Sequence, residues 1–168
     1  MNRAIAFTCS AVFIFTTAYC EPPAQDTPDD GERISGRVVN IADGDTLTIR
    51  TADGNTEKIR LFGIDAPERG QPFGRKAQAA LDAMIAGKTV TVKIEDRDQY
   101  GRLVGVVFRD TTNLNAAMLE QGMAWVYRKY THDAEWIALE TRARSERRGL
   151  WRDPNPVPPR EWRKRHSR

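Results

Sequence analysis

The amino-acid sequence predicts an α+β domain that is mainly β, with five short strands and about three helices. Between residues 33 and 109, apolar and polar side chains alternate in short runs, as in half-buried strands, and turn-forming residues separate the runs. Elsewhere apolar residues recur every three or four positions, which is the period of an amphipathic helix. The chain has 168 residues, of which 40% are hydrophobic, so it can build one core and is not intrinsically disordered. Its 29% content of charged residues excludes a multi-span membrane protein.

Five runs are predicted to form the strands: 33–41, 46–51, 57–63, 89–95 and 103–109. In the second run, Leu47 and Ile49 fall on one face, and Ala-Asp-Gly-Asn at 52–55 favours a tight turn into the third. In the fourth run, Val90 and Val92 fall on one face. These strands therefore offer an apolar side to a core.

Three further stretches are predicted to form helices. The first lies between the third and fourth strands, where Ala77, Leu81 and Ile85 share one face and Gly87 follows. The second covers about 113–121 and the third runs from 133 to about 148, and a glycine follows each. Five strands interrupted by one helix and followed by two more match a small closed β-barrel. The OB-fold, a five-stranded barrel that commonly binds oligonucleotides, is of this kind.

The N-terminal segments point to export. Residues 1–20 are predicted to be a cleaved signal peptide, because Arg3 precedes an uncharged stretch, 4–18, that is shorter than a membrane span. A permanent anchor and lipidation of Cys20 are the alternatives. Residues 21–32 read as a Pro-rich acidic linker. We expect a secreted or periplasmic protein whose mature form has no cysteine, since Cys9 and Cys20 both lie in the leader.

The charge distribution sets the C-terminal part of the chain apart. The net charge is only +3, but residues 142–168 hold ten Lys or Arg against three Asp or Glu. The run at 142–148 is either a solvated helix end or a surface that attracts phosphates. Residues 152–168, with four prolines, show no periodicity and are predicted to be a basic Pro-rich tail.

Three short polar clusters carry the candidate chemistry. They are Asp-Gly-Asp-Thr at 43–46, the segment 60–69 with two carboxylates after an arginine, and Asp-Gln-Tyr-Gly-Arg at 98–102. Taken alone, each also fits a structural role: a solvated turn, a helix start, and a hairpin with a surface ion pair. Together and in this order, the clusters are more specific than any one of them alone.

In this order, the clusters resemble those of the staphylococcal nuclease (thermonuclease, SNase-like) family. The matching motifs are Asp-Gly-Asp-Thr, the Arg-x4-Asp-x2-Glu spacing from Arg60, Tyr-Gly-Arg at 100–102, Ala-Trp-Val-Tyr at 124–127 and Gly-Leu-Trp at 149–151. The resemblance covers residues 33–151. It implies an OB-fold barrel and a Ca²⁺-dependent nuclease that cleaves DNA and RNA and leaves 3′-phosphate ends. No stable protein partner is implied, and we expect a monomer.

The resemblance also implies roles for individual residues. The expected Ca²⁺ ligands are hard oxygen donors: Asp45, Asp65 and the backbone carbonyl of Ala66. The expected catalytic residues are two arginines that grip the phosphate and an acid that activates or orients water: Arg60, Arg102 and Glu68. The residues expected to contact the nucleotide are aromatic: Tyr100, Trp125 and Tyr127. The alternative function is a non-catalytic OB-type module that binds nucleic acid or protein.

Overall fold

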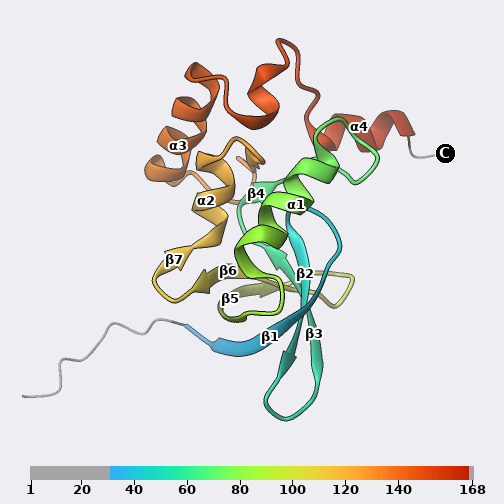
Figure 1. Cartoon of the computed structure of the whole chain (residues 1–168), viewed down its shortest axis with the longest axis vertical. Coiled ribbons are helices and arrows are strands. Elements are labelled where there is room, and N and C mark those ends of the chain that lie inside the picture. The colour runs from blue at the N-terminus through green and yellow to red at the C-terminus, as the bar shows by residue number, and fades with distance from the viewer. Residues whose placement is uncertain (1–30, 167–168) are drawn as a thin grey trace, which may run out of the picture.

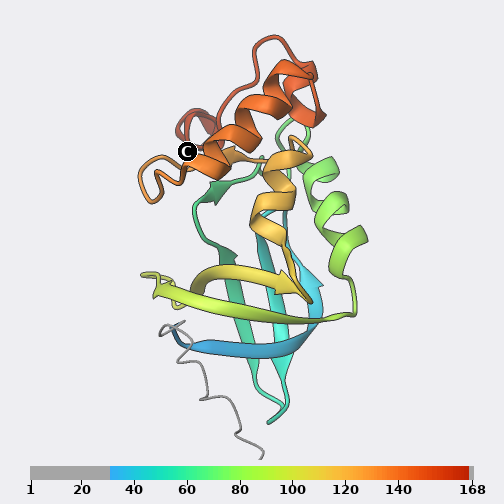
Figure 2. The same ribbon diagram turned by 90° about the vertical axis from the view of Figure 1, so that its left-hand side faces the viewer.

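The computed structural model describes residues 31–166 (Figure 1). The predicted signal peptide and almost all of the predicted linker lie outside these residues. The strands form a barrel at one end of the molecule, and the helices gather over its other end (Figures 1 and 2). Within residues 31–166, no helix has the length and apolar character needed to cross a membrane.

Five strands make the barrel: β1 (Arg33–Ile41), β2 (Thr46–Thr51), β3 (Thr56–Leu61), β5 (Thr89–Arg97) and β6 (Leu103–Arg109). They pair antiparallel in the order β3-β2-β1-β5-β6, and a parallel pairing of β3 with β6 closes the ring. This confirms the predicted mainly β, OB-like barrel. The third strand ends at Leu61 rather than at 63, because Gly63 adopts a positive φ of 67° and turns the chain.

Short strands and three of the helices fill the space above the barrel. Strand β4 (Ile64–Asp65) pairs with β8 (Trp125–Val126), and β7 (Thr112–Asn113) extends the sheet beside β6. The helices α1 (Gly74–Ile85), α2 (Leu114–Glu120) and α3 (Ala134–Ser145) occupy the predicted regions. Helix α3 begins where Asp133 accepts the backbone N–H groups of Glu135 and Trp136, as an N-cap does.

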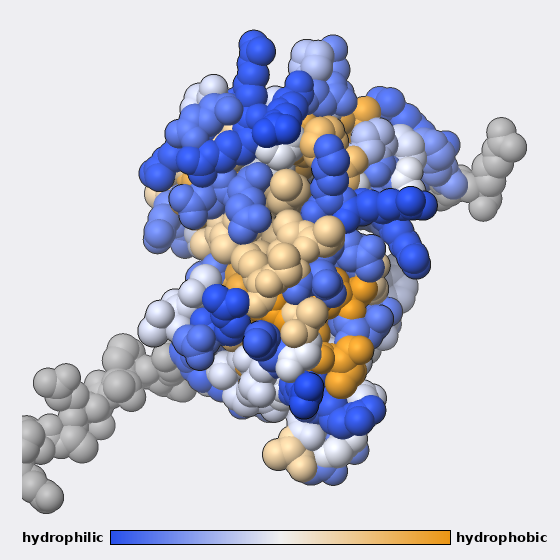
Figure 3. All heavy atoms as spheres, in the orientation of Figure 1, coloured by the Kyte–Doolittle hydropathy of each residue, from blue (hydrophilic) through white to orange (hydrophobic). Residues whose placement is uncertain are grey.

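The core runs from inside the barrel to the underside of the helices. Leu47, Ile49 and Ile59 line it from the strands and are fully buried, as is Leu81 of α1. Buried Asn115 of α2 is one polar connection between the two parts, because it accepts the Val107 N–H and donates to the carbonyl of Phe62. This pair of bonds fixes the chain where it leaves β3 toward β4. Figure 3 shows hydrophilic residues over much of the helical end and apolar residues near the middle of that face.

The C-terminal segment differs from the prediction. After the 3-10 helix η1 (Gly149–Arg152), residues Pro159–His166 form a fourth helix, α4. Pro159 and Trp162 are its only apolar residues, so no periodic stripe marks it in the sequence. Long-range contacts position this segment instead: the Gln71 side chain, in the loop before α1, donates to the carbonyl of Val157 at 2.6 Å.

Candidate functional site

One pocket of about 710 Å³ collects most of the predicted site residues. It lies where the end of β3, the loop after β4, the β5–β6 turn and the segment after β8 meet. Five residues singled out in the sequence line it: Arg60, Glu68, Tyr100, Arg102 and Tyr127. Asp45 and Asp65 lie behind this lining, with only 2% and 4% of their surface exposed.

Arg60 bridges the two buried carboxylates. Its Nη1 donates to Asp45 Oδ1, and its Nη2 donates to Asp65 Oδ1 at 2.9 Å. The β2–β3 ladder produces this arrangement, because Arg60 lies opposite Thr46, the neighbour of Asp45. The turn before β2 is closed by the Asp43 side chain, which accepts the Asp45 N–H at 3.0 Å. The cluster 43–46 is therefore a structural turn that also presents a carboxylate to the site.

Asp45 is strongly affected by its surroundings. Burial raises the pKa of Asp45 to about 7, although the positive charge of Arg60 acts in the opposite direction. The neighbouring carboxylates of Asp43 and Asp65 also act to raise this pKa, whereas the Ala66 N–H, which donates to Asp45 Oδ2 at 2.6 Å, acts to lower it. Negative charge at this carboxylate is therefore costly unless more positive charge is brought to it.

Arg102 enters the pocket from the β5–β6 turn. Asp98 shapes this turn, since its Oδ1 accepts the backbone N–H groups of Tyr100 and Arg102. Asp98 Oδ2 accepts the Arg102 Nε at 2.7 Å. Partial burial acts to raise the pKa of Asp98, but these hydrogen bonds from Arg102 and Tyr100 lower it overall. Within residues 31–166 the terminal nitrogens of Arg102 make no hydrogen bond, so they can bind a phosphate.

The sequence did not predict Arg163 as a site residue, yet α4 brings it there. Its Nη1 donates to Glu68 Oε1 at 2.5 Å, and its Nη2 donates to Asp65 Oδ2 at 3.2 Å. Burial acts to lower the pKa of Arg163, but the hydrogen bond to Glu68 and the charge of Asp65 raise it above its ordinary value. No local signal separates Arg163 from the other basic residues of the tail.

Aromatic side chains line the rims of the pocket. Tyr100 is 75% exposed in the β5–β6 turn. On another part of the rim, the rings of Tyr127 and Tyr130 meet edge to face with centroids 4.9 Å apart, and Lys129 Nζ lies 5.1 Å from the Tyr130 ring. The sequence analysis missed Tyr130 and Lys129, although their closeness to Tyr127 in the chain is a visible signal.

Trp125 does not reach the pocket, which corrects the expectation that it contacts the nucleotide. It is 8% exposed, and its ring packs edge to face on Trp151 with centroids 5.2 Å apart. In the β4–β8 pair, Trp125 lies opposite Asp65. Trp125 is therefore a core residue that supports the strand carrying a site carboxylate.

The donor chemistry of the site fits a hard divalent cation. Four carboxylates (Asp43, Asp45, Asp65 and Glu68) meet two guanidinium groups (Arg60 and Arg163), which leaves an excess of two formal negative charges. Carboxylate oxygens are the ligands that Ca²⁺ prefers. Among residues 31–166, no three Asp, Glu, His or Cys side chains are grouped to hold a metal ion, because the arginines lie between the carboxylates. A role for the Ala66 carbonyl stays a prediction.

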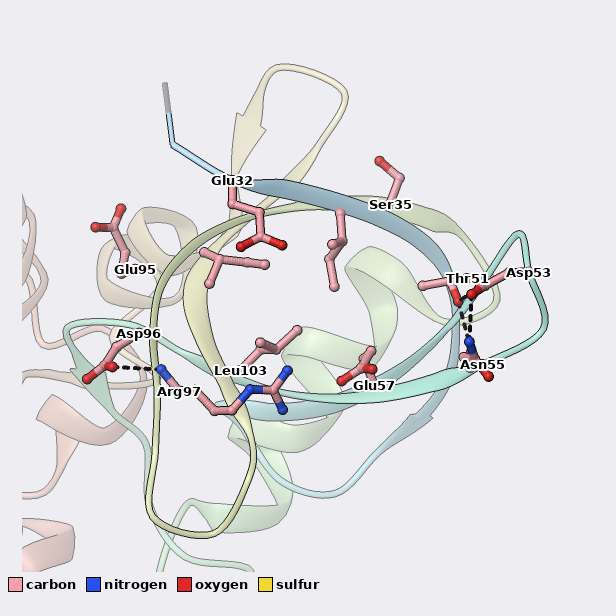
Figure 4. Close-up of a pocket in the computed structure, with 12 residues that line it drawn as sticks. Glu32, Ser35, Thr51, Asp53, Asn55, Glu57, Glu95, Asp96, Arg97 and Leu103 are labelled. Atoms are coloured by element: carbon pink, nitrogen blue, oxygen red, sulfur yellow. Dashed lines mark hydrogen bonds between the residues drawn. The ribbon is translucent and has the colours of Figure 1, made fainter. Parts of the chain in front are cut away.

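A second hollow, of about 740 Å³, is lined mostly by acidic residues and lies within the ring of strands (Figure 4). Five acidic residues line it: Glu32, Asp53, Glu57, Glu95 and Asp96. Arg97 is the basic residue of this lining. A polyanion such as nucleic acid is repelled by this surface, so the pocket that holds Arg60, Arg102 and Arg163 is the candidate site.

Comparisons with known proteins identify the family of the chain. Residues 58–153 match the family described as "Staphylococcal nuclease homologue". The chain is 38% identical over 167 residues to an uncharacterized endonuclease of Haemophilus influenzae, which covers 99% of this chain and 89% of that protein. It is 45% identical over 133 residues to an uncharacterized endonuclease of Escherichia coli O157:H7, covering 79% and 86% of the two chains. It is 41% identical over 140 residues to a protein named micrococcal nuclease from Shigella flexneri, covering 77% and 80%. The chain therefore belongs to the staphylococcal nuclease homologue family.

Proposed function

We propose that this protein hydrolyses the phosphodiester bonds of DNA and RNA with Ca²⁺ as its cofactor and leaves 3′-phosphate ends. One observation carries the proposal: Arg60, Glu68 and Arg102, from three separate segments, line one pocket in front of two buried carboxylates. Membership of the family supports it, as do relatives named endonuclease and micrococcal nuclease.

The residues of the pocket divide the reaction between them. The guanidinium groups of Arg60 and Arg102 bind the non-bridging phosphate oxygens, where negative charge grows in the transition state. Glu68, whose side chain is 37% exposed, accepts a proton from the attacking water or orients it. Asp45 and Asp65 would hold Ca²⁺, which when bound polarises a phosphate oxygen and acidifies water. Tyr127 and the exposed Tyr100 offer ring faces on which bases stack.

A digestion assay tests this function. Plasmid DNA and a folded RNA are incubated with the protein in Ca²⁺, in Mg²⁺ and in excess chelator, and the product ends are identified by their response to a 3′-phosphatase. We expect cleavage in Ca²⁺ and none in chelator. The variant Glu68→Gln is assayed in parallel. Its matched control is Glu95→Gln, in the acidic hollow, because both substitutions remove one carboxylate charge. Binding of nucleic acid without cleavage would instead favour the non-catalytic module.

We also propose that the protein is exported, because residues 1–20 have the charge and length of a signal peptide. Intact-mass measurement on protein from its native host tests this. A mature chain starting near Glu21 is expected. A mass that retains residues 1–20, or that carries lipid on Cys20, would contradict it.

A further inference from the structure

The C-terminal helix reaches into the site through one side chain. Arg163 of α4 lies between Asp65 and Glu68 and donates to both, at 3.2 Å and 2.5 Å. The other carboxylate bridge is made by Arg60, so the charges alternate along the row Asp45, Arg60, Asp65, Arg163, Glu68. Asp65 belongs to both bridges. Arg163, which makes the second bridge, lines the pocket.

The segment that carries Arg163 is held at the site by a specific contact. The Gln71 side chain is 6% exposed, accepts the backbone N–H of Glu68 at 3.1 Å, and donates to the carbonyl of Val157 at 2.6 Å. One buried amide thus joins the loop of Glu68 to the chain entering α4, and Pro159 at the start of the helix is buried. Figure 1 shows α4 beside the loop that precedes α1. The approach of Arg163 is therefore part of the fold.

A guanidinium group in this position makes the contacts that a metal cation would make. It neutralises Asp65 and Glu68 and takes up the lone pairs of Asp65 Oδ2 and Glu68 Oε1. A divalent cation on Asp65 needs the same buried carboxylate, and two positive charges a few ångströms apart repel each other there. Both cannot occupy this position at once.

We propose that Arg163 and the divalent cation compete for Asp65, so that cation binding releases α4 from the site and frees Glu68 from its ion pair. In the cation-free protein, Arg163 neutralises Asp65 and Glu68 and forms part of the pocket lining, and the cation displaces it. This inference rests on the proposed function for the presence of a cation at the site. Because coupling between two binding events is reciprocal, whatever loosens α4 also tightens cation binding.

Direct cation binding tests the competition without any substrate. Ca²⁺ is titrated calorimetrically into the wild-type protein, Arg163→Gln and Arg165→Gln. Arg165 is the matched control, because it lies on the same helix, loses the same charge and pairs with exposed Glu161, at 3.4 Å. For a half-exposed ion pair we expect Arg163→Gln to bind Ca²⁺ about three- to tenfold more tightly than wild type. Arg165→Gln should bind like wild type. Equal Kd values for the two variants would overturn the inference.

Hydrogen exchange on the wild-type protein gives a second test that needs no variant. Saturating Ca²⁺ should increase amide exchange over residues 160–166 relative to NaCl of equal ionic strength. Unchanged or increased protection of α4 in Ca²⁺ would overturn the inference even if the wild-type protein binds Ca²⁺, and the proposed function would stand. If none of the three proteins binds Ca²⁺ and cleavage persists in chelator, the cation dependence in the proposed function is wrong, and the competition is wrong with it.

Discussion

Replacing Arg60 with lysine should destabilise the cation-free protein by about 3 kcal/mol, although the formal charge is unchanged. The two nitrogens of Arg60 bond to different carboxylates, Asp45 and Asp65. A lysine has one nitrogen and cannot span both. One buried carboxylate then loses a charge-assisted hydrogen bond, which contributes about 1.5–3 kcal/mol, and keeps part of its desolvation cost. Because both carboxylates are at most 4% exposed, water cannot replace the lost donor.

Thermal unfolding in excess EDTA measures this effect. For a domain of this size, each kcal/mol shifts Tm by roughly 2–4 °C, so Arg60→Lys should melt about 6–12 °C below wild type. Arg50→Lys, on the neighbouring strand β2 and exposed, is the control and should change stability by less than about 0.5 kcal/mol. If Arg60→Lys melts like Arg50→Lys, the bridge does not stabilise the site and the reasoning fails. In Ca²⁺, folded Arg60→Lys should also lose on the order of 10²-fold in kcat, because an ammonium cannot form the bidentate contact with phosphate.

Three further predictions concern catalysis, the core and pH. Glu68→Gln should lower kcat on a short oligonucleotide by about 10²- to 10⁴-fold with little change in KM; cleavage within a few-fold of wild type by the folded variant would rule out the assigned role. Asn115→Ala should lower the free energy of unfolding in urea by about 3 kcal/mol, because it leaves the Val107 N–H and the Phe62 carbonyl without their buried partner. The control Asn155→Ala, at an exposed position, should leave it almost unchanged. Equal urea midpoints for the two variants would show that the buried amide is dispensable. Burial raises the pKa of Asp45 to about 7, so protons compete with Ca²⁺ for this carboxylate below that pH. The Ca²⁺ concentration for half-maximal activity should therefore rise about tenfold per pH unit as the pH falls from 7. A flat dependence between pH 5.5 and 8 would contradict this.

Local patterns predicted the barrel because its strands alternate and its turns use residues suited to turns. The strands 33–41, 46–51 and 103–109 have the predicted bounds, whereas their pairing order is known only from the structure. The family resemblance named residues that the fold brings to one place. Arg60, Glu68 and Arg102 lie on segments whose directions the barrel fixes, and they line one pocket.

The sequence was least informative where long-range contacts determine the structure. Helix α4 lacks an apolar stripe, and Arg163 finds Asp65 across 98 residues of chain, so no window of sequence holds both partners. Trp125 shows a related failure. A two-residue strand has too few positions to reveal which side is buried, and its partner Trp151 lies far along the chain. In both cases tertiary packing decides the role of the side chain.

The parallel pairing that closes the barrel also affects how activity appears during folding. Ile59 pairs with Leu103 and Arg60 with Val104, so the arginine of β3 and the one preceding β6 come together only when the ring is complete. Parallel contacts between distant segments form slowly, because the chain loses loop entropy before any contact compensates. An open sheet with all its antiparallel hairpins intact would have native-like circular dichroism and no catalysis. The time course of cleavage after dilution from denaturant should therefore report on the pairing of β3 with β6. Cleavage should recover later than secondary structure does.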